Sequence, residues 1–275
     1  MKTAIISLKN EYGLKGGVLK AIAMDCPWDN NEYWKRPAVI VVPGGGYGFV
    51  SKREGEPVAT EFLAKGFQTF VLDYAVGGEN GTPYPEQLFE MACAVDYVKK
   101  HADEYSVNHN EVFVVGFSAG GHLTGNLAVE CDEVPVMLGK KIDCRPTAVG
   151  LGYPVISSIH GHQGSYENLL YGYTDEAKSE LLKKLNLDQA VKNTTPPAFI
   201  WTTAKDTCVP PDNALRYALA CDKNGVDYEL HVYPIGNHGK STGAKEINDD
   251  EPIDQIKKWL PACIDFFHSF VVERH

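Results

Sequence analysis

From residue 36 onward, the chain alternates between short apolar segments and longer segments of helical character. Segments rich in apolar and β-branched residues predict strands at 38–42, 67–73, 111–117, 147–152, 198–203 and 228–233. Helices are predicted between them at 56–65, 85–101, 119–130 and 212–224, with a closing helix at 251–271. Strands that alternate with helices imply an α/β fold, in which a mainly parallel sheet carries helices on both faces.

The chain begins with two further segments of strand character, at residues 3–9 and 17–25. Gly16 and Gly17 stand between them, and a glycine pair at such a place indicates a hairpin or a bulge. We therefore expect two short strands at the start of the chain that are joined by a tight connection.

The strand at 111–117 ends in a Gly-x-Ser-x-Gly motif centred on Ser118, and a helical segment follows at once. This strand–turn–helix context is that of a nucleophile elbow, a sharp turn that lifts the serine hydroxyl toward a substrate. Gly116 and Gly120 would supply room where a Cβ would clash with neighbouring backbone, and Gly121 would let the helix lie close to the sheet. The alternative is an incidental serine in a glycine-rich loop, so the motif needs partners elsewhere in the chain.

A serine hydroxyl is a poor nucleophile near neutral pH, so it needs a base and an acid that orients the base. In this architecture the acid and then the histidine follow the serine, on loops after late strands. Asp206 comes directly after the strand at 198–203, whereas Asp212 is better placed as an N-cap or first-turn residue of the next helix. His238 lies in a glycine-flanked loop after the last strand. We therefore predict Ser118, Asp206 and His238 as the catalytic residues.

The negative oxygen that forms during acyl transfer needs preorganised N–H donors, and losing one donor costs about a hundred- to a thousandfold in rate. The run Gly44, Gly45 and Gly46 follows the strand at 38–42 and can offer backbone N–H groups, alongside that of Ala119 after the nucleophile. We name Gly45, Gly46 and Ala119 as predicted donors, and which glycine of the run donates stays open. A phosphate loop is the alternative, but the run lacks a Gly-Lys-Ser/Thr ending and the glycine spacing of a dinucleotide site.

Three other histidines near these motifs have structural interpretations. His122 lies four residues after Ser118 on the same helix, so it should point beneath the turn, where we expect a hydrogen-bonding or packing role. His160 and His162 could suggest a metal site. Because neither a cysteine nor a well-placed carboxylate accompanies them, we expect them to be cap or pocket residues, and we predict no metal.

Residues 153–195 interrupt the alternation of strands and helices. The part at 157–172 is rich in His, Gly, Ser and Tyr, and the part at 175–187 has the pattern of a polar helix. We interpret residues 153–195 as an insertion that covers the active-site face within a single domain of residues 1–275. A chain of this length buries about three quarters of its unfolded surface, so it needs no disulfide or metal to stabilise the core.

Charge and cysteine content narrow the expected partners and location. The chain has 275 residues with 26 basic and 36 acidic side chains, a net charge of −10. This balance argues against nucleic acid and against an anionic membrane surface as partners. The first residues lack the apolar core of a signal peptide, and no run is long enough for a transmembrane helix. Seven scattered cysteines without a Cys-x-x-Cys pair are typical of reduced thiols, so we expect a cytoplasmic location.

Taken together, the motifs resemble those of small α/β-hydrolase carboxylesterases. The resemblance rests on Pro-Gly-Gly-Gly-Tyr at 43–47, Ser-Lys-Arg-Glu at 51–54 and Gly-Phe-Ser-Ala-Gly-Gly-His-Leu at 116–123, with further similarity at 153–157 and 164–170. Such proteins are known as acetyl esterases, acetylxylan esterases or feruloyl-type esterases, and they are related to the hormone-sensitive-lipase branch. The chain departs from lipase-type relatives at Val42-Pro43, where those relatives carry a histidine before the glycines.

The resemblance covers residues 38–240 and implies an α/β-hydrolase fold with the triad Ser118, Asp206 and His238. It implies a cofactor-free serine esterase of small-molecule, short-chain acyl esters, such as acetyl esters on sugars or xylo-oligosaccharides. A homo-oligomer is compatible with the sequence. An amidase, a formamidase or a small peptidase uses the same triad and stays an alternative. A non-catalytic binding module on a hydrolase fold is the alternative from a different class.

Overall fold

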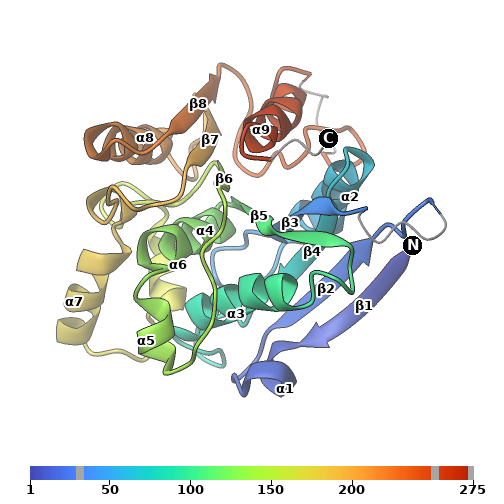
Figure 1. Ribbon diagram of the computed structural model, residues 1–275. Helices are drawn as coiled ribbons and strands as arrows, with labels where there is room; N and C mark the ends of the chain where they lie inside the picture. Colours follow the sequence, from blue (N-terminus) through green and yellow to red (C-terminus); the bar gives the residue numbers. More distant parts are fainter. Residues whose placement is uncertain (29–33, 249–253, 272–275) are drawn as a thin grey trace.

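One eight-stranded sheet runs through the computed structural model, which describes residues 1–28, 34–248 and 254–271 (Figure 1). The strand order is β1-β2-β4-β3-β5-β6-β7-β8. Strand β2 runs antiparallel to β1 and β4, and all pairs from β4 to β8 are parallel, which confirms the predicted mainly parallel sheet. The strands are β1 (Lys2–Ser7), β2 (Val18–Ala23), β3 (Arg36–Val42), β4 (Gln68–Asp73), β5 (Val107–Phe117), β6 (Val149–Gly152), β7 (Ala198–Thr203) and β8 (Tyr228–Tyr233).

Helices cover both faces of this sheet (Figure 1). One face carries α1 (Leu8–Tyr12), α3 (Glu86–Lys100), α4 (Ala119–Glu130), α5 (Val134–Leu138) and α8 (Asp212–Asn224). The other face carries α2 (Glu56–Ala64) and α9 (Trp259–His268). Short 3₁₀ helices are η1 (Lys52–Glu54), η2 (Leu187–Gln189) and η3 (Ile256–Lys258).

The two faces of the sheet bury separate apolar clusters, which explains why the central strands are apolar without alternation. In β3, Ile40 and Val42 belong to the cluster beneath α3 and α4, whereas Val39 and Val41 belong to the cluster beneath α2 and α9. Successive side chains of a strand point to opposite faces, so a strand covered on both sides needs apolar residues at every position.

The first two strands pair antiparallel, as the predicted hairpin requires, but a short helix rather than a tight turn connects them. Residues 8–9, predicted as strand, begin the short helix α1 between β1 and β2. The Ser7 hydroxyl accepts a hydrogen bond from the Asn10 N–H, and Gly13 ends the helix with φ 70°. An N-capping serine and a left-handed glycine are strong local helix signals, and they override the strand character of residues 8–9.

The C-terminal helix is also shorter than predicted. It forms as α9 from Trp259, after the 3₁₀ turn η3, and it ends at His268. The first predicted residues, 251–253, lie outside the described residues. Helix α5 was not predicted, because its five residues are too few to show a helical period.

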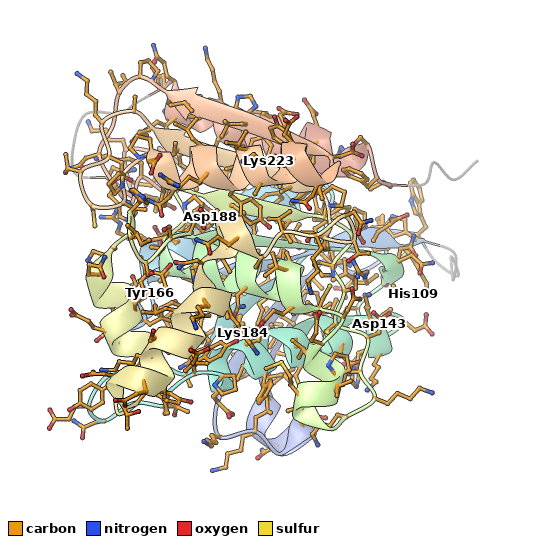
Figure 2. All side chains as sticks on the ribbon, turned by 90° about the vertical axis from the view of Figure 1, so that its left-hand side faces the viewer. His109, Asp143, Tyr166, Lys184, Asp188 and Lys223 are labelled. Carbon is orange, nitrogen blue, oxygen red and sulfur yellow. The ribbon has the colours of Figure 1, made fainter. Side chains whose placement is uncertain are left out.

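Residues 153–195 contain α6 (Gln163–Leu169), α7 (Asp175–Leu185) and η2. Figure 2, in which this side faces the viewer, shows Tyr166 of α6, Lys184 of α7 and Asp188 of η2 on one side of the molecule. The predicted polar helix at 175–187 is thus present as α7. Within the described ranges, no helix combines the length and the apolar character needed to cross a bilayer.

Candidate active site

The turn between β5 and α4 has the sharp geometry that the motif predicts. Ser118 occupies it with φ 53° and ψ −118°, a conformation that non-glycine residues rarely adopt. A Cβ on Gly116 would lie 2.2 Å from the carbonyl oxygen of Gly120, and a Cβ on Gly120 would lie 2.2 Å from that of Val42. Both glycines are therefore required by the close approach of neighbouring backbone. Gly121 meets Pro154, since a Cβ there would lie 2.9 Å from the Pro154 Cβ.

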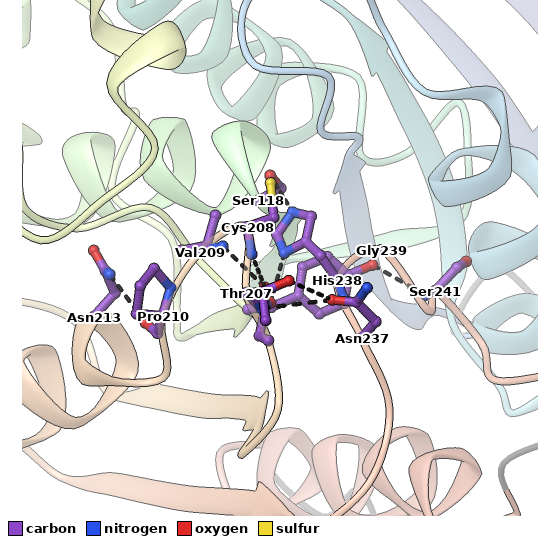
Figure 3. Close-up of polar contacts among 12 residues, drawn as sticks. Ser118, Thr207, Cys208, Val209, Pro210, Asn213, Asn237, His238, Gly239 and Ser241 are labelled. Atoms are coloured by element: carbon purple, nitrogen blue, oxygen red, sulfur yellow. Dashed lines mark hydrogen bonds and ion pairs between the residues drawn. The ribbon is translucent and has the colours of Figure 1, made fainter.

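The three predicted catalytic side chains come together at the carboxyl edge of the sheet, where Figure 3 labels Ser118 and His238. Ser118 Oγ lies 2.8 Å from His238 Nε2, and His238 Nδ1 lies 2.6 Å from Asp206 Oδ2. Because a carboxylate only accepts, Nδ1 carries the proton and Nε2 is left to accept from the serine hydroxyl. The Asp206 side chain is fully buried, whereas 18% of the His238 side chain is exposed. The imidazole thus contacts a carboxylate that is shielded from solvent on one side and is accessible from the pocket on the other.

The Asp206 carboxylate is held by its own loop. Its Oδ1 accepts hydrogen bonds from the backbone N–H groups of Cys208 and Val209, both at 2.9 Å (Figure 3). The side chain of Asn237, which lies beside His238, accepts a hydrogen bond from the Thr207 hydroxyl at 3.3 Å. The loop after β7 and the loop after β8 are therefore tied to each other where the acid and the base meet.

The glycine run after β3 presents two unpaired donors to the site. The Gly44 N–H donates to Glu54 Oε2 at 2.8 Å, so it is occupied. The N–H groups of Gly45, Gly46 and Ala119 have no hydrogen-bond acceptor among the residues that the structure describes. Gly45 and Gly46 have φ angles of 125° and 60°, and both line the pocket that contains Ser118. Of the three glycines, Gly44 therefore has an occupied N–H, whereas those of Gly45 and Gly46 stay available as predicted donors.

A pocket of about 620 Å³ opens above Ser118. Its wall includes His162 and Asn168, so the 153–195 segment contributes to it. His162 is a pocket residue, as predicted, whereas His160 lies 3.4 Å from Asp212 and is not part of this wall. No cluster of three or more potential metal ligands occurs in the described part of the chain. The pocket is lined by Gly45, Gly46, Gly48, Phe49, Ser51, Arg53, Glu54, Ser118, His162, Asn168, Cys208, His238 and Gly239.

His122 lies beneath the elbow and is buried, as predicted. Its Nε2 lies 3.0 Å from the Leu185 carbonyl oxygen, which can only accept, so Nε2 carries the proton. Its Nδ1 lies 2.7 Å from the Tyr47 hydroxyl and therefore accepts from it. Burial lowers the pKa of His122 to about 4, so the ring is neutral near pH 7. His122 thereby connects the glycine loop, α4 and the end of α7.

Sequence reasoning assigned no role to Glu54 or Tyr153. Glu54 is buried, and its Oε1 accepts a hydrogen bond from the Tyr153 hydroxyl at 2.6 Å. The Tyr153 ring lies edge-on against the His238 ring, with centroids 4.9 Å apart. Both residues stand within the segments that carry the resemblance, but no local pattern distinguishes a buried glutamate from an exposed one.

Comparison with known proteins identifies the family. A match to the BD-FAE family spans residues 24–219. The chain belongs to the BD-FAE family. It is 36% identical over 222 residues to endo-1,4-beta-xylanase B of Butyrivibrio fibrisolvens, covering 79% of this chain and 34% of that protein. It is 31% identical over 233 residues to an acetylxylan esterase of Xylanibacter ruminicola, covering 81% of this chain and 45% of that protein. The BD-FAE chain thus spans less than half the length of these curated relatives.

Solved structures are similar to this chain along nearly its whole length. An acetyl ester-xyloside bifunctional hydrolase from Caldicellulosiruptor lactoaceticus matches with a TM-score of 0.81 and 30% identity, covering 98% of this chain and 97% of that one. An α/β hydrolase from a Medee basin deep-sea metagenome library matches with a TM-score of 0.77 and 30% identity, covering 98% of both chains. The predicted α/β-hydrolase fold is confirmed. The proteins to which the chain is similar include a named acetylxylan esterase and a named acetyl ester-xyloside bifunctional hydrolase.

Proposed function

We propose that the chain is a serine esterase that hydrolyses short-chain acyl esters through Ser118, His238 and Asp206. The observation that carries the proposal is the pair of hydrogen bonds that joins them, at 2.8 Å from serine to imidazole and at 2.6 Å from imidazole to carboxylate. The comparison with named acetyl ester hydrolases supports the substrate class.

In this mechanism Ser118 Oγ attacks the ester carbonyl while its proton passes to His238 Nε2. The carbonyl oxygen becomes negative and is stabilised by the free N–H groups of Gly45, Gly46 and Ala119. His238 then donates the proton to the leaving alcohol as the C–O bond breaks, which leaves an acyl group on Ser118. Water hydrolyses this acyl-enzyme by the same route, and Asp206 holds the imidazole in its working tautomer throughout.

The proposed substrates are acetyl esters on sugars or xylo-oligosaccharides. Two observations support these substrates. The chain is similar to an acetylxylan esterase and to an acetyl ester-xyloside bifunctional hydrolase. Its pocket has a volume of about 620 Å³, which lies within the range of small-molecule sites. The pocket mixes an apolar ring, Phe49, with polar side chains such as Asn168 and His162. Such a wall suits a hydroxyl-bearing alcohol that also offers an apolar face.

Replacing Ser118 by alanine tests the proposal. We expect Ser118→Ala to lower kcat on p-nitrophenyl acetate by a factor on the order of 10⁴ or more, because removing any triad member leaves only the contribution of binding and the oxyanion donors. Ser157→Ala is the matched control, since Ser157 is also a buried serine but lies outside the pocket wall. Unchanged turnover in Ser118→Ala would rule out the proposed nucleophile.

Two further measurements separate the alternatives. A panel of acetyl, butyryl and longer esters with the matching amides distinguishes an esterase from an amidase, a formamidase or a peptidase, and we expect the short esters to have the highest kcat/KM. Labelling with a fluorophosphonate at neutral pH tests for an activated serine. We expect labelling of the wild type and none of Ser118→Ala, whereas an unlabelled wild type would indicate a binding module.

A further inference from the structure

A buried carboxylate connects the two loops that form the site. Glu54 ends the 3₁₀ turn η1, and only 4% of its surface is exposed. Its Oε2 accepts from the Gly44 N–H at 2.8 Å, and its Oε1 accepts from the Tyr153 hydroxyl at 2.6 Å. One of its contacts is thus with the loop that supplies the oxyanion donors, and the other is with the residue that follows β6.

Tyr153 extends this connection to the histidine. Its hydroxyl accepts a hydrogen bond from the Ser241 N–H at 3.0 Å, and its ring packs edge-on against His238. Burial next to the Glu54 carboxylate raises the pKa of Tyr153 well above its usual value, so the hydroxyl stays protonated and donates a hydrogen bond to Glu54. Tyr153 has a positive φ of 36°, which contacts with its surroundings must maintain.

The histidine loop is fixed to the same cluster by further hydrogen bonds. Ser241 lies three residues after His238, and its hydroxyl donates to the Arg53 carbonyl oxygen at 2.6 Å. The Ser241 carbonyl oxygen accepts from Trp259 Nε1 at 2.8 Å. The Arg53 guanidinium also donates to the Gly239 carbonyl oxygen. Arg53 therefore binds Gly239 and Ser241 directly, beside the bridge from Glu54 through Tyr153.

We propose that Glu54 and Tyr153 are positioning residues, which hold the oxyanion donors and His238 in register with Ser118. The inference rests on the esterase function proposed above. Neither side chain has to touch the reacting atoms: Glu54 fixes the backbone at Gly44, immediately before the donors Gly45 and Gly46, and Tyr153 supports the imidazole. Displacing such groups by about 1 Å can cost a hundredfold in rate, because the hydrogen bonds concerned reach full strength only in the transition state.

A carboxylate at position 54 suits this positioning role better than an amide, because both of its oxygens accept hydrogen bonds. Two donors, the Gly44 N–H and the Tyr153 O–H, point at its two carboxylate oxygens. A glutamine of the same shape has one accepting oxygen, so Glu54→Gln must present an N–H to one of the two donors. Tyr153→Phe removes only the hydroxyl and keeps the ring beside His238.

The test measures catalysis and transition-state binding separately. We expect Glu54→Gln and Tyr153→Phe each to lower kcat on p-nitrophenyl acetate by about tenfold or more, while KM changes by less than about threefold. Affinity for butylboronic acid, which forms a tetrahedral adduct with an active serine, should weaken by a factor similar to the loss in kcat. The double variant should lose less than the product of the single losses, since both residues share one hydrogen bond.

Tyr84→Phe is the matched control, because Tyr84 is also a buried tyrosine whose hydroxyl donates to a carboxylate, that of Glu130, outside the pocket wall. We expect it to keep the wild-type kcat and boronate affinity. If Glu54→Gln does not fold, Tyr153→Phe carries the test alone. Wild-type kcat and boronate affinity in a folded Tyr153→Phe would overturn the inference and leave the esterase intact. An inactive wild type would instead overturn the proposed esterase function.

Discussion

At the scale of single residues, Ser118 combines the proposed nucleophile with an unfavourable backbone conformation. Its φ of 53° and ψ of −118° lie in a region that is sparsely populated except by glycine. Residues held in such regions cost on the order of 1–3 kcal/mol each and persist where the surrounding structure fixes them. Here the backbone is fixed from both sides, since the Ser118 N–H donates to Gly152 and its carbonyl oxygen accepts from Val155 and His122.

This strain predicts that Ser118→Gly is more stable than Ser118→Ala, although both variants are inactive. Glycine relieves the strain but raises the entropy of the unfolded chain, an opposing effect of about 0.4–1 kcal/mol. We expect a net gain in the free energy of unfolding of about 1 kcal/mol, measured by urea denaturation of the two variants. Equal stability, or a less stable Ser118→Gly, would show that the strain at the elbow does not exceed the opposing effect of about 0.4–1 kcal/mol.

The two proposed glycine donors predict different responses to alanine. A Cβ on Gly45 would lie 2.0 Å from the Phe49 carbonyl oxygen, so Gly45→Ala must move the loop backbone. A Cβ on Gly46 meets nothing nearer than His162, at 3.7 Å, so Gly46→Ala mainly adds the cost of its positive φ, about 1–2 kcal/mol of stability.

We therefore expect Gly45→Ala to lower kcat on p-nitrophenyl acetate by about a hundredfold, and Gly46→Ala to lower stability with a smaller effect on kcat. Steady-state kinetics and thermal unfolding of both variants measure these effects. The wild-type kcat in Gly45→Ala would mean that the loop donors are not required.

At the scale of elements, His122 joins three segments that are far apart in the sequence. It sits on α4, accepts a hydrogen bond from Tyr47 of the glycine loop and donates one to the Leu185 carbonyl oxygen at the end of α7. The neutral ring can make both bonds, whereas a protonated ring would turn a second N–H toward the Tyr47 hydroxyl. The stability of these two hydrogen bonds therefore depends on pH.

The sign of the dependence follows from the lowered pKa. In the native state the pKa of His122 is about 4, and in the unfolded chain it is near 6.5. The unfolded chain binds the extra proton between these values, so the stability present above pH 6.5 is lost as the pH falls toward 4. We expect His122→Asn, in which Oδ1 can accept from Tyr47, to be less stable than wild type at pH 7. The deficit should shrink by about 1–2 kcal/mol at pH 5, as measured by urea unfolding. A constant deficit would contradict a buried neutral histidine.

Several elements could be predicted from the sequence to the residue, because local signals mark both ends. Helix α8 forms at the predicted residues 212–224: Pro211 precedes it, and Gly225 ends it in a left-handed conformation with φ 67°. Strand β7 forms at 198–203 as predicted, as an apolar run that follows Pro197 and is buried throughout. The approach of Ser118, Asp206 and His238 could be predicted for a similar reason, since each lies in the turn or loop that follows a strand, and parallel strands end at one edge.

The contacts beneath the site could not be predicted in this way. Glu54 and Tyr153 are 99 residues apart, and each takes its partner from a segment that only the fold brings near. Glutamate is rarely buried, so composition and periodicity favour an exposed Glu54. Helix α1 was missed for a different reason: its cap at Ser7 is a local signal, but the segment around it has the composition of a strand.

At the scale of the whole molecule, two buried ionisable side chains act on stability in opposite directions. His122 lies beneath the elbow, and Glu90 lies on α3, where its surface is fully buried. Burial raises the pKa of Glu90 to about 8. Its Oε2 accepts from the Ala75 N–H at 2.7 Å, but its Oε1 has no hydrogen-bond partner among the described residues. The folded protein therefore keeps this carboxyl protonated near neutral pH.

For Glu90 the native pKa exceeds the value of 4.5 for an unperturbed glutamate, so the native state binds the extra proton between pH 4.5 and pH 8. The stability present below pH 4.5 is lost as the pH rises through 8. Between pH 4.5 and 6.5 this loss opposes the gain from His122. Above pH 6.5 the effect of His122 is complete. Only Glu90 then continues to lower the free energy of unfolding, by about 1.4 kcal/mol for each pH unit.

Glu90→Gln keeps the shape of the side chain and the acceptor for the Ala75 N–H but cannot ionise. We expect wild type to lose about 2 kcal/mol more than Glu90→Gln between pH 6.5 and pH 8, since 1.5 pH units separate these values. Urea denaturation of both proteins across this interval measures the difference. Glu61→Gln, which removes an exposed carboxylate from α2, should follow wild type. If Glu90→Gln and wild type lose stability in parallel, Glu90 is already ionised in the folded protein, and the alkaline loss of stability must come from other groups.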